Sequence, residues 1–78
     1  MEFYEIAQSV KKLRKEKKLT QTELSKKVGI SRQTLSKLEN GFIGKVSLQV
    51  FIKLLDELNH ELEMVEKKPF YYFDLDEI

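Results

Sequence analysis

The chain has 78 residues, enough for one small domain, and its 41% apolar and 35% charged residues are typical of a folded protein rather than a disordered one. It has no cysteine and one histidine, His60, which excludes a disulfide framework and argues against a metal site. The sequence shows neither the roughly 20-residue apolar run of a membrane helix nor a signal-peptide core, so we expect a cytoplasmic protein.

The charge is divided unevenly along the chain. Residues 1–41 carry ten basic and five acidic side chains, a net charge of +5. Residues 42–78 carry four basic and eight acidic side chains, a net charge of −4. The first half is therefore basic enough to approach phosphate, although the net charge of the whole chain is only +1.

Apolar residues at helical spacing predict an amphipathic helix over residues 3–17. Its predicted inward positions are Phe3, Ile6, Ala7, Val10 and Leu13. A lysine run follows on the other face, at Lys11, Lys12, Lys15, Lys17 and Lys18. Such a run can be a solvated surface, or it can help to bind phosphate without sequence preference.

A second helix is predicted over Gln21–Val28. Thr20 suits its N-cap, and Glu23 three residues later completes a capping box. Gly29 follows where a left-handed residue ends a helix.

Ser31 can cap a third helix, Arg32–Glu39, which Asn40-Gly41 closes. The inward positions of these two helices and their turn are Leu24, Val28, Ile30, Leu35 and Leu38.

Ser47 opens a predicted fourth helix, about residues 48–58, which ends before Asn59, a residue that tolerates the left-handed conformation. Its predicted apolar stripe is Leu48, Phe51, Ile52, Leu55 and Leu58.

The hydrophobic period then changes from 3.6 to 2, which predicts one strand, about Glu61–Glu66. One strand cannot satisfy its own backbone groups, and the chain offers no obvious second strand. The economical partner is the same strand of another copy, with Leu62 and Met64 at the dimer contact.

Beyond Pro69 the chain ends in FYYFDLDEI. Its four aromatic residues can pack back on the dimer, or they can anchor a partner protein while the acidic residues face a basic cleft. We therefore assign tentative partner contacts to Phe70, Tyr71, Tyr72 and Phe73.

Two short helices joined at Gly29 form a helix-turn-helix layout, in which the second helix lies in the DNA major groove. Gln can bond adenine, Arg or Lys can bond guanine, and a Thr methyl can touch thymine. Gln21 lies where a helix N-terminus can grip a phosphate. The predicted DNA-binding set is Gln21, Ser31, Arg32, Gln33, Thr34, Ser36, Lys37 and Asn40.

The segment LTQTELSKKVGISRQTLSKLENG resembles the helix-turn-helix of the Cro/phage-repressor (XRE) family, and the resemblance extends over about residues 4–58. It implies a phosphate contact from Gln21, DNA-facing positions on the third helix, and a partly buried ion pair between Arg14 and Glu39. Ser25 stands where the family usually has Ala. Its hydroxyl can bond a carbonyl of its own helix, so this departure puts little in doubt.

A fourth helix that leads into one strand resembles the antitoxin subgroup of this family. Such antitoxins partner HipA-type kinase toxins or related toxins, and they dimerise through that strand. The resemblance implies a homodimeric repressor that binds a palindromic operator on double-stranded DNA and neutralises a toxin. A stand-alone regulator without a toxin partner is the alternative.

The expected fold is mostly α, with four helices, or five if a short turn is counted, followed by one dimerisation strand. We divide the chain into a DNA-binding domain at 1–59, a dimerisation strand at 60–67 and an acidic aromatic tail at 68–78. No nucleophile–base pair, metal set or phosphate-cradling glycine loop can be assembled, so we expect neither an enzyme nor a cofactor.

Overall fold

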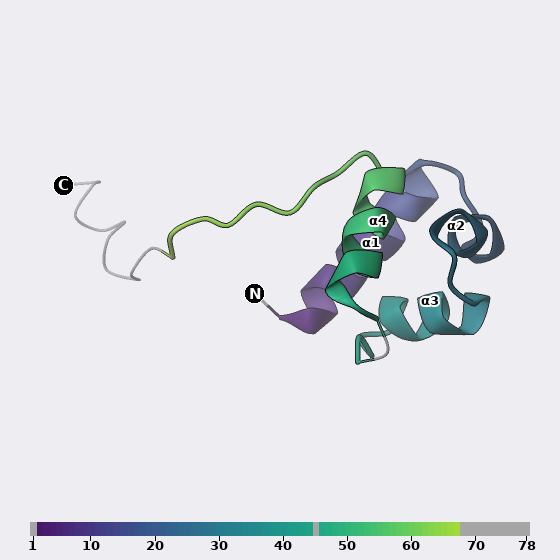
Figure 1. The fold of residues 1–78 in the computed structure, drawn as a ribbon, viewed down its shortest axis with the longest axis horizontal. Helices are drawn as coiled ribbons and strands as arrows, with labels where there is room; N and C mark the ends of the chain where they lie inside the picture. Colours follow the sequence, from purple (N-terminus) through teal and green to yellow (C-terminus); the bar gives the residue numbers. More distant parts are fainter. Residues whose placement is uncertain (1, 45, 68–78) are drawn as a thin grey trace.

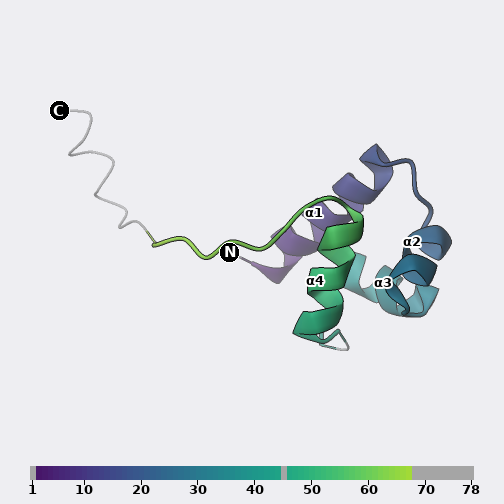
Figure 2. The same cartoon turned by 45° about the horizontal axis from the view of Figure 1, so that its top comes forward.

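The computed structural model describes residues 2–44 and 46–67. These residues form four helices, α1 (Phe3–Glu16), α2 (Gln21–Val28), α3 (Arg32–Glu39) and α4 (Leu48–Glu57). Helix α2 packs on α3 and α4, and α1 packs on α3 (Figures 1 and 2). The predicted four-helix order is confirmed, and the bounds differ from the predicted ones by one residue at the ends of α1 and α4.

Side-chain caps start three of the helices. Thr20 Oγ1 accepts the Glu23 N–H at 3.0 Å, and Glu23 Oε1 accepts the Thr20 N–H at 2.9 Å, so the predicted capping box is confirmed. Ser31 caps α3 and Ser47 caps α4 in the same way, each by accepting a backbone N–H three residues on. Each cap satisfies an amide that has no partner inside its helix.

Each of the four helices is followed, within two residues of its end, by a residue with positive φ. Gly29 (φ 86°) and Gly41 (φ 95°) occupy this position after α2 and α3, and Asn59 (φ 59°) occupies it after α4, as expected. Lys18 (φ 58°) does the same after α1, which the sequence did not indicate. In each case the next residue's N–H bonds a carbonyl five residues back, as from His60 to Leu55 at 2.8 Å.

One apolar core joins the four helices. It consists of Val10, Leu24, Val28, Leu35, Leu38, Phe51, Leu54, Leu55 and Leu58. The predicted inward positions on α2 and α3 are therefore confirmed, and Ile30 packs against the core from the turn. Burial of these side chains fixes the angle between α2 and α3.

The predicted apolar stripes of α1 and α4 are wrong in part, because some of the residues placed inward are exposed. Leu48 is 67% exposed and Ile52 is 45% exposed, whereas Leu54, absent from the predicted stripe, is buried. Phe3 is 62% exposed. Leu48 and Phe3 each begin a helix, where a side chain tilts toward the N-terminus and so away from the core. Ile52 lies at the edge of the face that carries Phe51 and Leu55.

Residues 60–67 extend away from the helices as a single segment (Figure 1). No strand forms in this part of the described chain, and all eight residues are exposed. A strand exists only through its backbone pairing, and the predicted pairing requires a second copy. The dimerisation strand therefore stays a prediction. The tail at 68–78 lies outside the described residues.

Candidate DNA interface

The outward face of α3 carries the side chains that the sequence assigned to DNA. Arg32, Gln33 and Lys37 are exposed, as are Ser31 and Asn40 at the two ends of the helix, while Thr34 and Ser36 are half-buried. Opposite them, Leu35 and Leu38 are buried in the core. The helix therefore anchors one face and leaves its long polar side chains free to enter a groove, as a recognition helix does.

Short side chains on α3 bond their own backbone. Ser31 Oγ accepts the Thr34 N–H at 3.0 Å, and the two hydroxyl oxygens lie 2.8 Å apart. Asn40 Nδ2 donates to the Ser36 carbonyl at 2.9 Å. These bonds order the first and last turns of α3. The DNA contacts predicted for the short side chains Ser31, Thr34, Ser36 and Asn40 stay predictions.

An ion pair joins α1 to the end of α3. Arg14 Nε lies 2.7 Å from Glu39 Oε2, and Arg14 Nη2 lies 2.9 Å from Oε1. Both residues are buried, and Arg14 also donates to the Leu19 carbonyl at 2.8 Å. The pair expected from the family resemblance is therefore present, and its two parallel bonds fix α3 against α1.

Gln21 has two side-chain partners in the free chain. Its Nε2 donates to Glu39 Oε1 at 3.2 Å, and its Oε1 accepts from Arg32 Nη1 at 3.3 Å. Sequence patterns did not indicate these bonds, because 18 and 11 residues separate the partners. The predicted phosphate contact of Gln21 stays a prediction.

Ser25 lies buried where α2 meets its neighbours. Its hydroxyl donates to the Thr22 carbonyl at 2.9 Å, as expected for a hydroxyl inside a helix. The polar side chain is thus satisfied locally, and it does not disturb the packing of α2.

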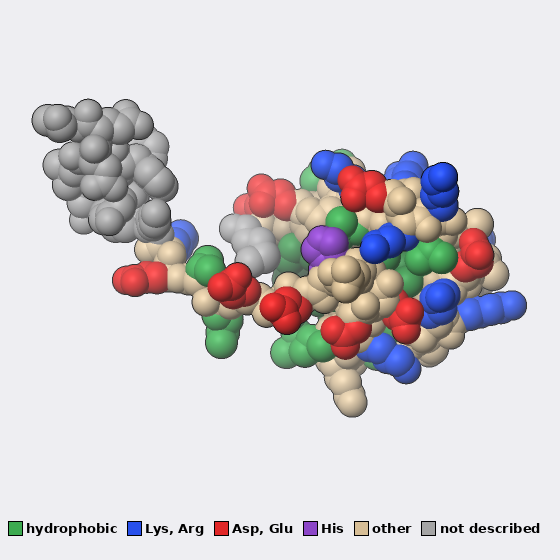
Figure 3. Space-filling model, turned by 90° about the horizontal axis from the view of Figure 1, so that it is seen from above, with side chains coloured by type: hydrophobic (Ala, Val, Ile, Leu, Met, Phe, Trp, Pro, Cys, Tyr) green, Lys and Arg blue, Asp and Glu red, His purple; other side chains and the backbone are tan. Residues whose placement is uncertain are grey.

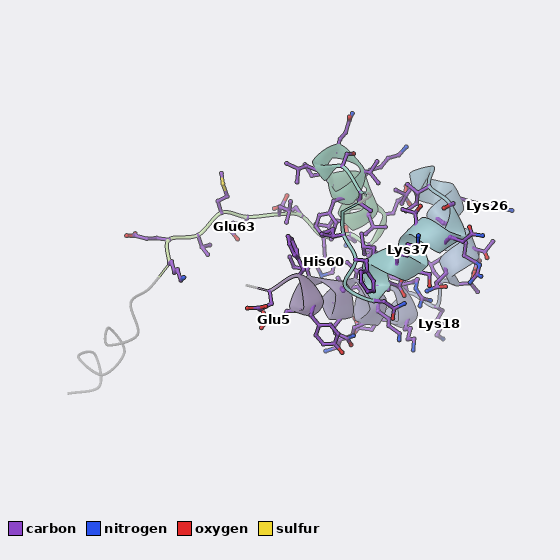
Figure 4. The ribbon with its side chains drawn as sticks, turned by 90° about the horizontal axis from the view of Figure 1, so that it is seen from below. Glu5, Lys18, Lys26, Lys37, His60 and Glu63 are labelled. Carbon is purple, nitrogen blue, oxygen red and sulfur yellow. The ribbon has the colours of Figure 1, made fainter. Side chains whose placement is uncertain are left out.

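The positive charge gathers on the helix-turn-helix end. Lys18, Lys26 and Lys37 lie there, at the opposite end from Glu63 on the extended segment (Figure 4). Lys and Arg side chains predominate over that end, while acidic side chains line the segment that leads away (Figure 3). The uneven charge of the sequence is thus an uneven charge in space, which favours approach of one end to a polyanion.

The capping box also lowers the pKa of the Glu23 carboxyl group. The Thr20 N–H bond to the Glu23 carboxylate, aided by the Thr20 hydroxyl and by Lys27, holds the pKa of Glu23 below its ordinary value of 4.5. A negative Glu23 in the first turn of α2 also suits the positive end of the helix dipole.

A comparison with known protein families shows the family of this chain. A family model described as Helix-turn-helix matches residues 10–64. The chain belongs to this family. The match includes α2, α3 and α4, and the family is of the Cro/phage-repressor (XRE) type expected from the sequence.

Within the helix-turn-helix family the chain is similar to antitoxin HipB of Escherichia coli O6:H1 (strain CFT073). The two are 34% identical over 64 residues, which is 82% of this chain and 67% of HipB. Two solved structures, a HipA-HipB-O2-O3 complex and a HipB-O4 20mer complex, each contain a chain with 31% identity and a TM-score of 0.75. In both cases the match covers 87% of this chain and 94% of the other.

A further match shows the fold alone. The structure of apo-HppE shares 21% identity with a TM-score of 0.71, and the match covers 78% of this chain and 34% of that protein.

Among residues 2–44 and 46–67, none of the helices is long and apolar enough to cross a membrane. The described residues also hold no group of three His, Cys, Asp or Glu side chains suited to a metal ion.

Proposed function

We propose that this protein is a sequence-specific transcriptional repressor that acts as a homodimer on a palindromic operator and serves as the antitoxin of a toxin–antitoxin pair. One observation carries the proposal: α3 anchors one face in the core and presents Arg32, Gln33 and Lys37 outward at the basic end. The similarity to HipB supports the antitoxin role.

In this proposal each α3 enters a major groove, and the two half-sites lie about 34 Å apart, one helical turn of DNA. Gln33 and Arg32 contact base edges, with Thr34 and Ser36 beside them. Lys37 contacts guanine or phosphate. Gln21, Ser31 and Asn40 hold the DNA backbone near the two ends of the helices. Specific affinity is on the order of 10 nM and falls steeply with salt.

Substitution of Gln33 by Ala tests the base contact. The preferred DNA is first selected from a random duplex pool with the wild-type protein, and affinities are then measured by fluorescence anisotropy. Because a bidentate base contact is worth about 1–3 kcal/mol, Gln33→Ala should weaken specific binding by about 5- to 150-fold and relax the preference at one base pair per half-site.

Lys37→Ala should also lower the salt dependence of DNA binding, whereas Lys53→Ala is the matched control. Lys53 is exposed on α4, so its loss removes the same charge outside α3 and outside the segment proposed to form the dimer. If Gln33→Ala and Lys37→Ala leave specific binding unchanged in folded protein, the assignment of α3 is wrong.

The dimer is proposed to form through residues 60–67. Leu62 is 51% exposed and Met64 is fully exposed, so the single chain leaves apolar side chains and unpaired backbone along this segment. Pairing with a second copy covers both, and it sets the spacing of the two α3 helices.

The partner protein is proposed to be a HipA-type or related toxin. The structure of a HipA-HipB-O2-O3 complex supports this choice. Deletion of residues 70–78, which include Phe70, Tyr71, Tyr72 and Phe73, tests the tail as a docking segment. We expect unchanged DNA affinity and loss of the complex with the toxin encoded beside this gene. Equal loss of both activities points to a structural tail, and the absence of a toxin gene favours the stand-alone regulator.

A further inference from the structure

Four side chains form a continuous line from the core to the outward face of α3. Arg14 bonds Glu39 through two contacts of 2.7 and 2.9 Å. Glu39 Oε1 accepts from Gln21 Nε2 at 3.2 Å, and Gln21 Oε1 accepts from Arg32 Nη1 at 3.3 Å. Exposure rises along this line, from the buried Arg14 and Glu39 through the half-buried Gln21 to the exposed Arg32.

The chemistry of Glu39 determines which way the Gln21 amide points. A carboxylate paired with a guanidinium only accepts hydrogen bonds, and Glu39 is just 2% exposed, so water cannot compete for its oxygens. The amide must therefore turn its NH₂ group toward Glu39, because the reverse orientation sets two acceptor oxygens against each other. That orientation leaves the carbonyl oxygen of Gln21 facing Arg32.

The carbonyl of Gln21 then orients Arg32. A guanidinium is planar with five N–H donors in a fixed fork, so one bond to Gln21 restricts its plane and leaves other donors for DNA. Arg32 is the first residue of α3, where the helix begins to meet a groove. A long side chain that is already oriented loses less conformational freedom on binding.

We propose that Glu39 is a positioning residue for DNA recognition: through the amide of Gln21 it holds Arg32 in the orientation that contacts DNA. This inference rests on the proposed function, because it concerns the same face of α3. It gives the buried ion pair a second role beyond holding α1 to α3. It also gives Gln21 a role that does not depend on a phosphate contact.

A double-mutant cycle on DNA affinity tests the link between Gln21 and Arg32. If Gln21 acts through Arg32, Gln21→Ala should weaken binding much less in an Arg32→Ala background than in the wild type, with a coupling of about fivefold. The cycle of Gln21→Ala with Lys37→Ala is the matched control and should be additive within about twofold. Additive losses for Gln21 and Arg32 overturn the proposal.

Substitution of Glu39 by Gln tests the first link. The new side chain keeps its size but presents an NH₂ group as well as an oxygen, so the Gln21 amide is no longer held in one orientation. We expect Glu39→Gln to be coupled to Arg32→Ala by about threefold or more and to relax the base preference of Arg32. A fully additive effect in folded protein contradicts the role of Glu39. If this variant does not fold, the Gln21 cycle decides.

Nuclear magnetic resonance of the free protein separates this inference from the proposed function. The Arg32 side-chain N–H signal should be sharp and distinct in the wild type and should move to the solvent-averaged position in Gln21→Ala. Lys37→Ala should leave it unchanged. If DNA binding fails while this pattern holds, the proposed function is wrong and the positioning geometry stands. If the Arg32 signal is solvent-averaged in the wild type, the positioning proposal is wrong.

Discussion

The helix-turn-helix region and the segment at 60–67 differ in how far a single chain satisfies their polar groups and buries their apolar side chains. From Thr20 to Gly41, capping bonds, a left-handed glycine turn and buried leucines all favour one conformation. From Glu61 to Lys67 every residue is exposed, and none of these residues makes a backbone hydrogen bond with another part of the described chain. One region satisfies its polar groups and covers its apolar side chains within a single chain, and the other does not.

This difference separates the parts of the molecule that a single chain determines from those that need a partner. The helix-turn-helix has a conformation that is fixed before DNA binds, which suits a preorganised recognition surface. The extended segment has an unpaired edge and exposed apolar side chains, which suit pairing with a second copy. Substitutions in the helix-turn-helix region and its ion pair should therefore lower the free energy of unfolding more than a substitution in the extended segment does.

Arg14→Met should have the largest effect. It leaves the buried Glu39 carboxylate without its guanidinium, which costs about 3–5 kcal/mol of folding free energy. Denaturant unfolding followed by circular dichroism measures the loss. The double variant Arg14→Met with Glu39→Leu should recover most of it, because no buried charge then remains unpaired. A cost under about 1 kcal/mol for the single change means that the pair does not hold α1 to α3.

Gly29→Ala should come next, and it isolates backbone conformation. Gly29 has φ 86°, and no atom lies within 4 Å of a Cβ built there, so the added methyl meets open space. The left-handed conformation alone should cost about 1–2 kcal/mol in thermal or denaturant unfolding. Gly44→Ala is the matched control, since its Cβ also meets open space without a positive φ. Equal effects at the two glycines exclude a conformational cause.

Thr20→Ala should lower stability by about 1 kcal/mol through loss of the N-cap. Its effect should also depend on pH. The folded-state pKa of Glu23 is below 4.5, so the stability that Glu23 contributes is present above pH 4.5 and is lost as pH falls through the folded pKa. Thr20→Ala removes the hydroxyl but keeps the backbone N–H, so an NMR titration of Glu23 should show a partial rise of its pKa.

Ser47→Ala is the control for that pH dependence. Ser47 caps α4 with Val50 in place of an acidic residue at the third helical position, so its loss should cost the same at pH 3 and pH 6. A matching pH dependence in the two variants contradicts the role given to Glu23.

Met64→Glu should have the smallest effect on the chain itself. Met64 is fully exposed, so unfolding free energy at concentrations where the chain is monomeric should change by less than about 0.5 kcal/mol. Sedimentation should nevertheless show a weaker dimer, because the substitution sets like charges near the twofold axis. Glu63→Gln, on the other face of the predicted strand, serves as control. Unchanged dimerisation in Met64→Glu excludes this face from the contact.

Local patterns predicted α2 and α3 with their bounds, because each signal lies within a few residues of its effect. Thr20 and Glu23 are three residues apart, and the N–H of Ile30, which follows Gly29, bonds the Ser25 carbonyl. The stripe of α4 was only partly predicted. Periodicity shows which residues share a face, but it does not show where the neighbouring helices end, so Leu48 and Ile52 were wrongly placed inward.

The sequence by itself therefore determined four helices, the side-chain caps of three of them, the turns after α2, α3 and α4, and the polar outward face of α3, since these depend on short-range hydrogen bonds and on one apolar period. Tertiary structure alone decided the contacts of Gln21. Its bonds to Glu39 and Arg32 join residues 18 and 11 positions apart, and they form only after the buried leucines bring α2 and α3 together. That packing places a polar side chain of α2 between a buried ion pair and the outward face of α3.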